Sequence, residues 1–93
     1  MNKQECKKYF RRAYKRLITN NKPISISNIE NEMNNVIDTQ KEEYIAYSKI
    51  AVHNMQKSGN AEIRLKDLLS QIDILPQIFK RETAINKAKI LLK

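Results

Sequence analysis

Apolar residues recur at helical spacing in the first segment of the chain, from about Lys3 to Asn20. Successive members are four, three, one and three residues apart, which places them on one stripe of an α-helix. The stripe consists of Cys6, Phe10, Ala13, Tyr14 and Leu17. Pro23 follows soon after and disfavours helical geometry in the residue before it. The pattern therefore predicts an amphipathic helix over about residues 3–20.

Capping residues predict where the next helices begin. The second helix starts at Ser25 or Ser27. In the latter case Ser27 and Glu30 would form a capping box, in which hydroxyl and carboxylate each accept a hydrogen bond from a free backbone N–H group. Residues 39–42 repeat this pattern, which indicates a break near Asp38 and a third helix that runs to about Ser58. The inward side of that helix is Tyr44, Tyr47, Ala51 and Met55, or Ile45, Val52 and Met55.

Glycine and proline divide the rest of the chain. Gly59, the only glycine, suits a left-handed cap at the end of the third helix, and Asn60 can cap a fourth. Leu75 and Pro76 would end the fourth helix, with Pro76 in the first turn of a fifth. The residues expected to pack from the fifth helix are Ile78, Phe79, Ile85, Ala88 and Leu92. We expect an all-α fold, a compact bundle of four to five short helices in a single domain over residues 1–93.

Charge is distributed unevenly along the chain. The net charge is +8, from 18 Lys and Arg against 10 Asp and Glu. Residues 1–22 hold eight cations and one anion, residues 23–48 hold one cation and five anions, and residues 49–93 hold nine cations and four anions. The excess positive charge is therefore concentrated at the N-terminal helix, and the middle of the chain is acidic.

The cations of the first helix come in adjacent pairs opposite its apolar stripe. Many are also four residues apart, and each such like-charge pair opposes helix formation by a few tenths of a kcal/mol. A polyanionic partner explains why this arrangement is kept, and nucleic acid fits best. Neutralising about six phosphates would give a slope of roughly −4 to −5 for log affinity against log salt. An acidic protein surface or a solvated face are the alternatives. The predicted nucleic-acid-binding cations are Lys7, Lys8, Arg11, Arg12, Lys15 and Arg16.

Aromatic residues suggest two further contacts. Tyr9 lies at the edge between the apolar and basic faces, where its ring could stack on an unpaired base. The alternative is a boundary residue with an exposed hydroxyl. Tyr44 and Tyr47, beside Glu43, resemble a protein-docking surface in which aromatic residues anchor a partner. The alternative is that one of these two tyrosines packs inward.

Motifs of catalysis and ligand binding are missing from the sequence. It has no glycine-rich phosphate loop, no paired Cys and His ligands and no nucleophile elbow. We expect neither an enzyme, nor a metal site, nor a cofactor, nor a small-molecule substrate. Cys6 lies on the apolar stripe, which suits a small core residue. Because no apolar run is long enough for a membrane span, we expect a cytoplasmic protein.

Lys, Ile and Asn make up 36 of the 93 residues, as is typical of genes from AT-rich genomes. In size, in this composition and in the basic block of residues 7–16, the chain is similar to the small middle protein of staphylococcal cassette chromosome replication modules. That resemblance implies an accessory protein that partners a family A DNA polymerase and assists primer synthesis. In size and helical character the chain also resembles cytosolic bacteriocin immunity proteins, which protect by protein contact.

We therefore expect a non-catalytic accessory protein that binds single-stranded or duplex DNA. It would act as an adaptor subunit for a polymerase or primase of a mobile element or phage. The alternative is a protein-binding inhibitor, of the bacteriocin-immunity type, without a role on nucleic acid.

Overall fold

Five α-helices account for most of the chain in the computed structural model, which describes residues 2–37, 42–59 and 63–91. The helices are α1 (Lys3–Thr19), α2 (Ile26–Val36), α3 (Glu42–Lys57), α4 (Leu65–Ile78) and α5 (Arg81–Lys89). The described residues form no strand, so the prediction of an all-α bundle is confirmed.

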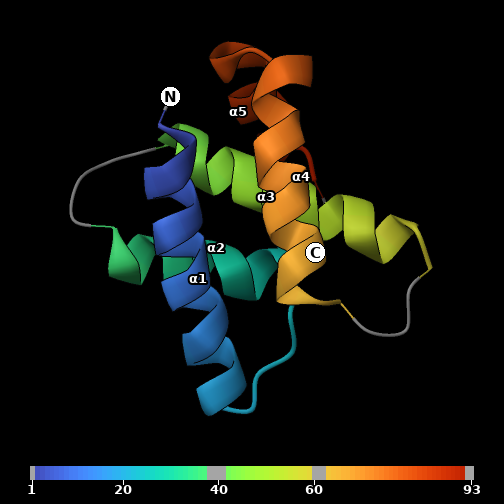
Figure 1. The fold of residues 1–93 in the computed structure, drawn as a ribbon. Helices are drawn as coiled ribbons and strands as arrows, with labels where there is room; N and C mark the ends of the chain where they lie inside the picture. Colours follow the sequence, from blue (N-terminus) through green and yellow to red (C-terminus); the bar gives the residue numbers. More distant parts are fainter. Residues whose placement is uncertain (1, 38–41, 60–62, 92–93) are drawn as a thin grey trace.

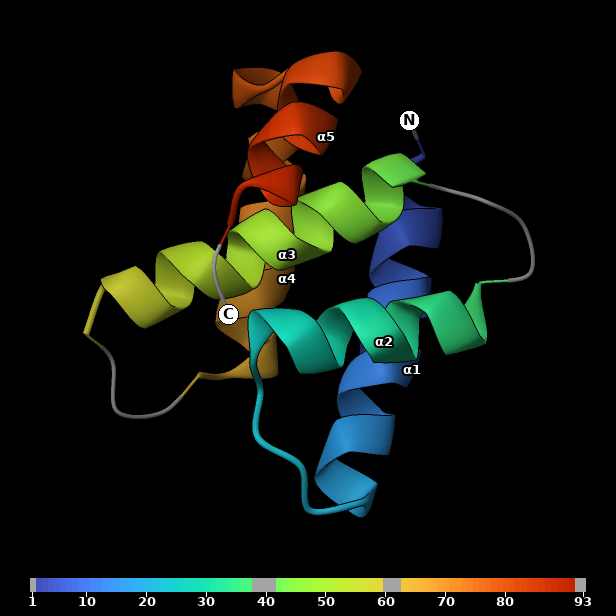
Figure 2. The ribbon, with the colours of Figure 1, turned by 180° about the vertical axis from the view of Figure 1, so that it is seen from behind.

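Four of the helices form two crossed layers, and α5 packs on α3. Figure 1 shows α1 and α4 side by side in front, with α2 and α3 crossing behind them. Figure 2 shows the opposite side, where α2 and α3 lie in front and α5 packs on α3. Helix α3 contacts α2, α4 and α5. Both sets of residues predicted as its inward side therefore pack against neighbouring helices. Its buried residues are Tyr44, Ala46, Tyr47, Ser48, Ile50, Ala51, Val52 and Met55.

The apolar stripe of α1 faces this core. Cys6, Phe10, Ala13 and Leu17 are fully buried, as the spacing predicts. Tyr14, the fifth member, is half-buried and its hydroxyl donates a 3.3 Å hydrogen bond to the carbonyl of Ile63. Full burial of a side chain such as Phe10 or Leu17 contributes about 1.5–3 kcal/mol. The stripe therefore fixes which side of α1 remains in solvent.

Side-chain caps define the beginnings of α1 and α2. The Asn2 side chain accepts a 3.0 Å hydrogen bond from the backbone N–H of Glu5. Ser25 caps α2, since its hydroxyl oxygen accepts from the N–H of Asn28 at 3.1 Å. The start at Ser25 is thus confirmed, and the capping box of Ser27 and Glu30 is wrong. Glu30 instead accepts a 2.6 Å hydrogen bond from Lys49, which joins α2 to α3.

Gly59 ends α3 as expected, with a φ of 77° that residues with a side chain rarely adopt. The proposed caps at residues 39–42 and at Asn60 lie outside the described residues, apart from Glu42.

The end of α4 differs from the prediction. The helix continues through Pro76 to Ile78, and the N–H of Phe79 still bonds to the carbonyl of Leu75 at 2.8 Å. A proline this close to the end removes only one hydrogen bond of the helix. Helix α5 consequently begins later, at Arg81, and Ile78 is 61% exposed and does not pack inward.

All five helices contribute to one core. The packing residues predicted for α5 are partly confirmed, because Ala88 is buried and Phe79 and Ile85 pack at the edge of the core. Leu92 lies outside the described residues. The Cα radius of gyration is 11.8 Å, close to the value of about 12 Å expected for a compact chain of this length. No helix of the described ranges has both the length and the apolar character needed to cross a membrane.

Candidate nucleic-acid interface

The side of α1 opposite the core carries four exposed cations. Helix α1 packs against α2 on one side and α4 on the other, which leaves its third side in solvent. We call the four residues on this side the basic ridge. None of them has an ion-pair partner among the described residues. The basic ridge consists of Lys8, Arg11, Arg12 and Lys15.

Lys7 was predicted to bind nucleic acid, but the structure turns it toward α4. Its Nζ lies 2.9 Å from Oδ1 of Asp73, and its side chain is only 12% exposed. Lys7 therefore holds α1 to α4 and is not part of the ridge. The sequence could not reveal this, because the pairing of α1 with α4 is a property of the fold.

Arg16 is likewise engaged, on the side of α2. Its Nε donates a 2.6 Å hydrogen bond to Oε2 of Glu32, whose side chain is 8% exposed. The hydrogen bond from Arg16 lowers the pKa of the Glu32 carboxyl, although burial opposes this effect. Asn35 donates a further hydrogen bond to Oε1 at 3.3 Å. Arg16 nevertheless stays half in solvent, with guanidinium donors to spare at the edge of the ridge.

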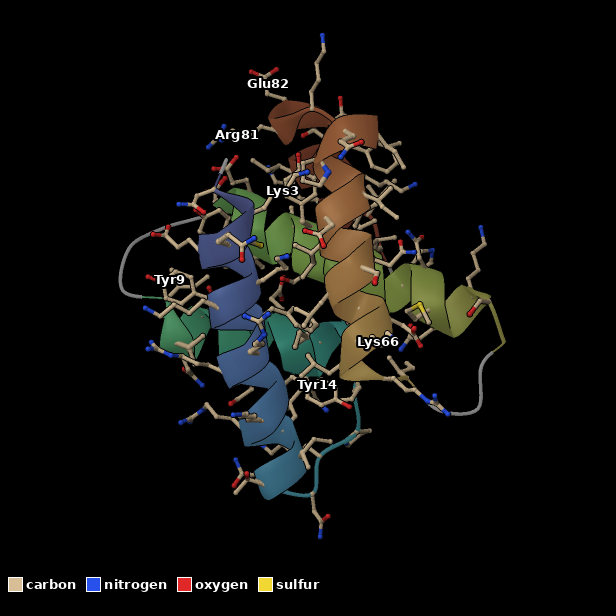
Figure 3. The ribbon with its side chains drawn as sticks, viewed as in Figure 1. Lys3, Tyr9, Tyr14, Lys66, Arg81 and Glu82 are labelled. Atoms are coloured by element: carbon tan, nitrogen blue, oxygen red, sulfur yellow. The ribbon has the colours of Figure 1, made fainter. Side chains whose placement is uncertain are left out.

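Tyr9 does not present a free ring. It is half-buried and lies on the side of α1 away from α4 (Figure 3). Its ring packs against that of Tyr44, with the centroids 6.2 Å apart and the planes tilted by 37°. The contact stabilises the junction of α1 and α3, so the ring expected to stack on a base is largely in use within the fold.

The predicted docking surface of Tyr44 and Tyr47 is wrong, because both residues are 2% exposed. The Tyr44 hydroxyl donates a 2.8 Å hydrogen bond to Oε1 of Glu5, and the Tyr47 hydroxyl donates one of 2.8 Å to the carbonyl of Phe79. Burial raises the pKa of both phenols. The two tyrosines are three residues apart and therefore lie on the same face of α3. This spacing was the sequence signal that both could pack into the core. Glu43 is mostly buried too, 3.9 Å from Nε of Arg81.

Helix α4 adds a cation that the sequence pattern did not single out. The helices α1 and α4 run in opposite directions, since Lys7 meets Asp73 and Tyr14 meets Ile63. The N-terminal turn of α4 therefore lies beside the C-terminal half of α1. Figure 3 shows Lys66 there, across from Tyr14, and Lys66 is exposed. It extends the positively charged surface beyond the ridge.

Other reactive groups and hollows offer less. The Cys6 thiol is fully buried, and burial together with nearby carboxylates raises its pKa to about 12. A thiol in that state is not a nucleophile. A shallow cavity of about 200 Å³ lies between α2, α3 and α5, below the range of about 300–1,000 Å³ for small-molecule sites. The described residues contain no group of three His, Cys, Asp or Glu able to hold a metal ion.

The basic ridge is thus the surface with the clearest chemical capacity, which is to bind a polyanion. It presents four cations over about 10 Å of helix axis, at a rise of about 1.5 Å per residue. Two of them are arginines, whose forked donors match phosphate oxygens. In comparisons with known proteins, no protein-family model, no curated protein and no solved structure matches the chain.

Proposed function

We propose that this chain is a non-catalytic accessory protein that binds nucleic acid through the basic ridge. The observation that carries the proposal is the exposure of four cations on one side of α1 with no carboxylate partner among the described residues. The pairs Lys8 with Arg12 and Arg11 with Lys15 are each four residues apart, so they destabilise the helix that carries them. A bound phosphate backbone would relieve this repulsion.

The structure changes the expected size of the contact. Lys7 and Arg16 are occupied by Asp73 and Glu32, so four cations are free to neutralise phosphates where the sequence indicated six. The expected slope of log affinity against log salt is about −3.6 for duplex DNA and about −2.8 for a single strand.

The second part of the proposal is attachment to a larger protein, as an adaptor for a polymerase or primase of a mobile element or phage. It is supported by the resemblance in size, charge and composition to replication-module accessory proteins. Ile74 and Ile78, one turn apart on α4, are exposed and offer a small apolar contact. Apolar residues at the centre of an interface contribute more to its affinity than the polar rim around it.

A titration with matched variants tests the nucleic-acid part. The measurement is fluorescence anisotropy of a labelled 24-mer, as a single strand and as a duplex, at about 0.1 M salt. The ridge variant replaces four cations with Gln at Lys8, Arg11, Arg12 and Lys15. The control variant removes the same number of exposed charges elsewhere, with Gln at Lys57, Lys80, Arg81 and Lys89.

The ridge variant should lose at least about 100-fold in affinity, since each phosphate contact at this salt concentration is worth close to a factor of ten. The control variant should change by less than about fivefold, through net charge alone. Absence of binding by the unmodified protein, or equal losses in the two variants, would overturn the proposal.

A further inference from the structure

We infer that the basic ridge takes duplex nucleic acid in preference to single strands, and that it holds the duplex by its phosphates. The inference rests on the proposed function and specifies its ligand. It follows from three features of the molecule: the placement of every aromatic ring, the convex shape of the ridge, and the ion pairs that hold α1 on both sides.

No aromatic residue is exposed, as the stacking platform of a single-strand binder would be. The chain has four Tyr and two Phe, and all six lie within the described residues. Phe10, Tyr44 and Tyr47 are buried. The other three are half-buried and engaged: Tyr9 packs on Tyr44, the Tyr14 hydroxyl bonds to Ile63, and the Phe79 ring lies 5.5 Å from Nζ of Lys87.

This matters because single-strand binders gain about 1–3 kcal/mol for each base stacked on an aromatic side chain. Without that contribution the binding is electrostatic, and it follows the charge density of the polymer. A duplex carries one negative charge for about every 1.7 Å of its axis, twice the density of one of its strands at the same rise. The denser polymer is therefore the better ligand for this surface.

The shape of the surface favours the same ligand. Proteins that bind single strands usually follow the backbone with a positively charged groove. Here the cations stand on the outer side of a helix, which is convex. About half to two-thirds of all protein–DNA hydrogen bonds go to phosphate oxygens and sugars, and a convex surface reaches these groups from outside the duplex.

Ion pairs on both sides of the ridge hold α1 against its neighbours. Lys7 joins α1 to α4 through Asp73, and Arg16 joins it to α2 through Glu32. The two pairs lie at opposite ends of the ridge along α1, so the helix that carries the cations is held in place before a ligand arrives. A helix held in place suits the regular backbone of a duplex better than a flexible strand.

The test compares ligands on the unmodified protein. Affinities are measured for a mixed-sequence 24-nucleotide strand, for its duplex, and for a second duplex of shuffled sequence, from 50 to 200 mM salt. We expect the duplex to bind at least fivefold tighter than the strand, with a salt slope of about −3.6. The two duplexes should agree within about threefold, because phosphate contacts carry no sequence information.

A Tyr9→Leu variant tests whether Tyr9 stacks on a base, because only stacking would make single-strand affinity depend on this ring. Leucine keeps the half-buried apolar contact, so single-strand affinity should change by less than twofold. Single-strand binding as tight as duplex binding, a tenfold loss on Tyr9→Leu, or a tenfold difference between the duplexes would each overturn the inference and leave the proposed function standing. If no nucleic acid binds at 50 mM salt, the proposed function itself fails.

Discussion

Arg16 and Glu32 link α1 to α2, with Nε of the arginine 2.6 Å from Oε2 of the carboxylate. The Glu32 side chain is almost buried, whereas Arg16 remains half in solvent. A carboxylate removed from water needs its partner more than the exposed guanidinium does. The main role of Arg16 is therefore to pair with Glu32 within the fold. Only its remaining N–H donors are free for a ligand.

Replacing Arg16 with Gln should lower the free energy of unfolding by about 1.5–3 kcal/mol, the range for hydrogen bonds to charged groups. The measurement is urea unfolding at pH 7. Arg12→Gln is the matched control, because Arg12 is exposed on the ridge and lacks an ion-pair partner among the described residues. Equal stabilities of the two variants would contradict the role assigned to Arg16.

The same ion pair predicts a dependence of stability on pH. The hydrogen bond from Arg16 lowers the pKa of Glu32 in the folded protein. The ionised carboxylate thus stabilises the fold above its unfolded pKa of about 4.3, and this contribution is lost as the pH falls through the folded value. Unfolding curves of the unmodified protein and of Glu32→Gln should differ most at pH 6–7 and converge only as the pH falls below the folded pKa of Glu32, which lies under its unfolded value. A constant difference across this range would rule out the linkage.

Tyr44→Phe tests the buried contact between α3 and α1. Its hydroxyl donates a 2.8 Å hydrogen bond to Glu5, so the change should destabilise the protein by about 1–2 kcal/mol. Tyr9→Phe is the control, since the Tyr9 hydroxyl has no hydrogen-bond partner in the part of the chain that the structure describes. Thermal unfolding followed by circular dichroism measures both, and the prediction fails if Tyr9→Phe is the more harmful change.

The thiol of Cys6 should resist modification in the native protein. It is fully buried, and its pKa is raised to about 12, mainly by burial. At pH 8 only the unfolded chain offers an accessible thiolate in quantity, because an ordinary thiol has a pKa of about 8.5. A disulfide reagent should therefore react slowly in buffer and at once in 6 M guanidinium. Rapid reaction of the native protein would show that α1 opens easily.

Neutralising the basic ridge should stabilise the protein while it abolishes binding. Gln at Lys8, Arg11, Arg12 and Lys15 removes both charges of two like-charge pairs at a spacing of four residues. In two further pairs it removes one of the two charges. At a few tenths of a kcal/mol per pair, the gain is about 0.5–1 kcal/mol. Urea unfolding at low salt would detect it, and the gain should shrink at 0.5 M salt because exposed charges are screened. A loss of stability would mean that these cations have intramolecular partners.

Local sequence patterns predicted the features that depend on one segment alone. The apolar period of α1 identified its buried side, Gly59 was correct as a helix end, and Ser25 was one of the two starts considered for α2. These features follow from the geometry of a single helix and its terminal hydrogen bonds. Pro76 was misjudged because proline near a helix end removes only one bond, which packing against the core outweighs.

The features that were missed depend on which helices meet. Lys7 and Arg16 belong to the cationic pairs of α1 by sequence, yet Asp73 and Glu32 approach from α4 and α2. Tyr44 and Tyr47 stand beside acidic residues, which suggested a surface, but α3 is enclosed by three other helices. Charge and composition describe a segment, whereas the partners of a side chain depend on the tertiary arrangement.

The unpaired cations of α1 also connect ligand binding with folding. In most surface helices, acidic residues four positions away offset the basic ones, but the ridge has none. A phosphate backbone would take their place as the counterion. By mass action, a ligand that binds only the folded chain raises its stability, by about 2.7 kcal/mol at a concentration one hundred times the dissociation constant. The phosphates would then supply the negative charges that acidic residues supply on other surface helices. Binding would therefore raise the thermal midpoint of the protein.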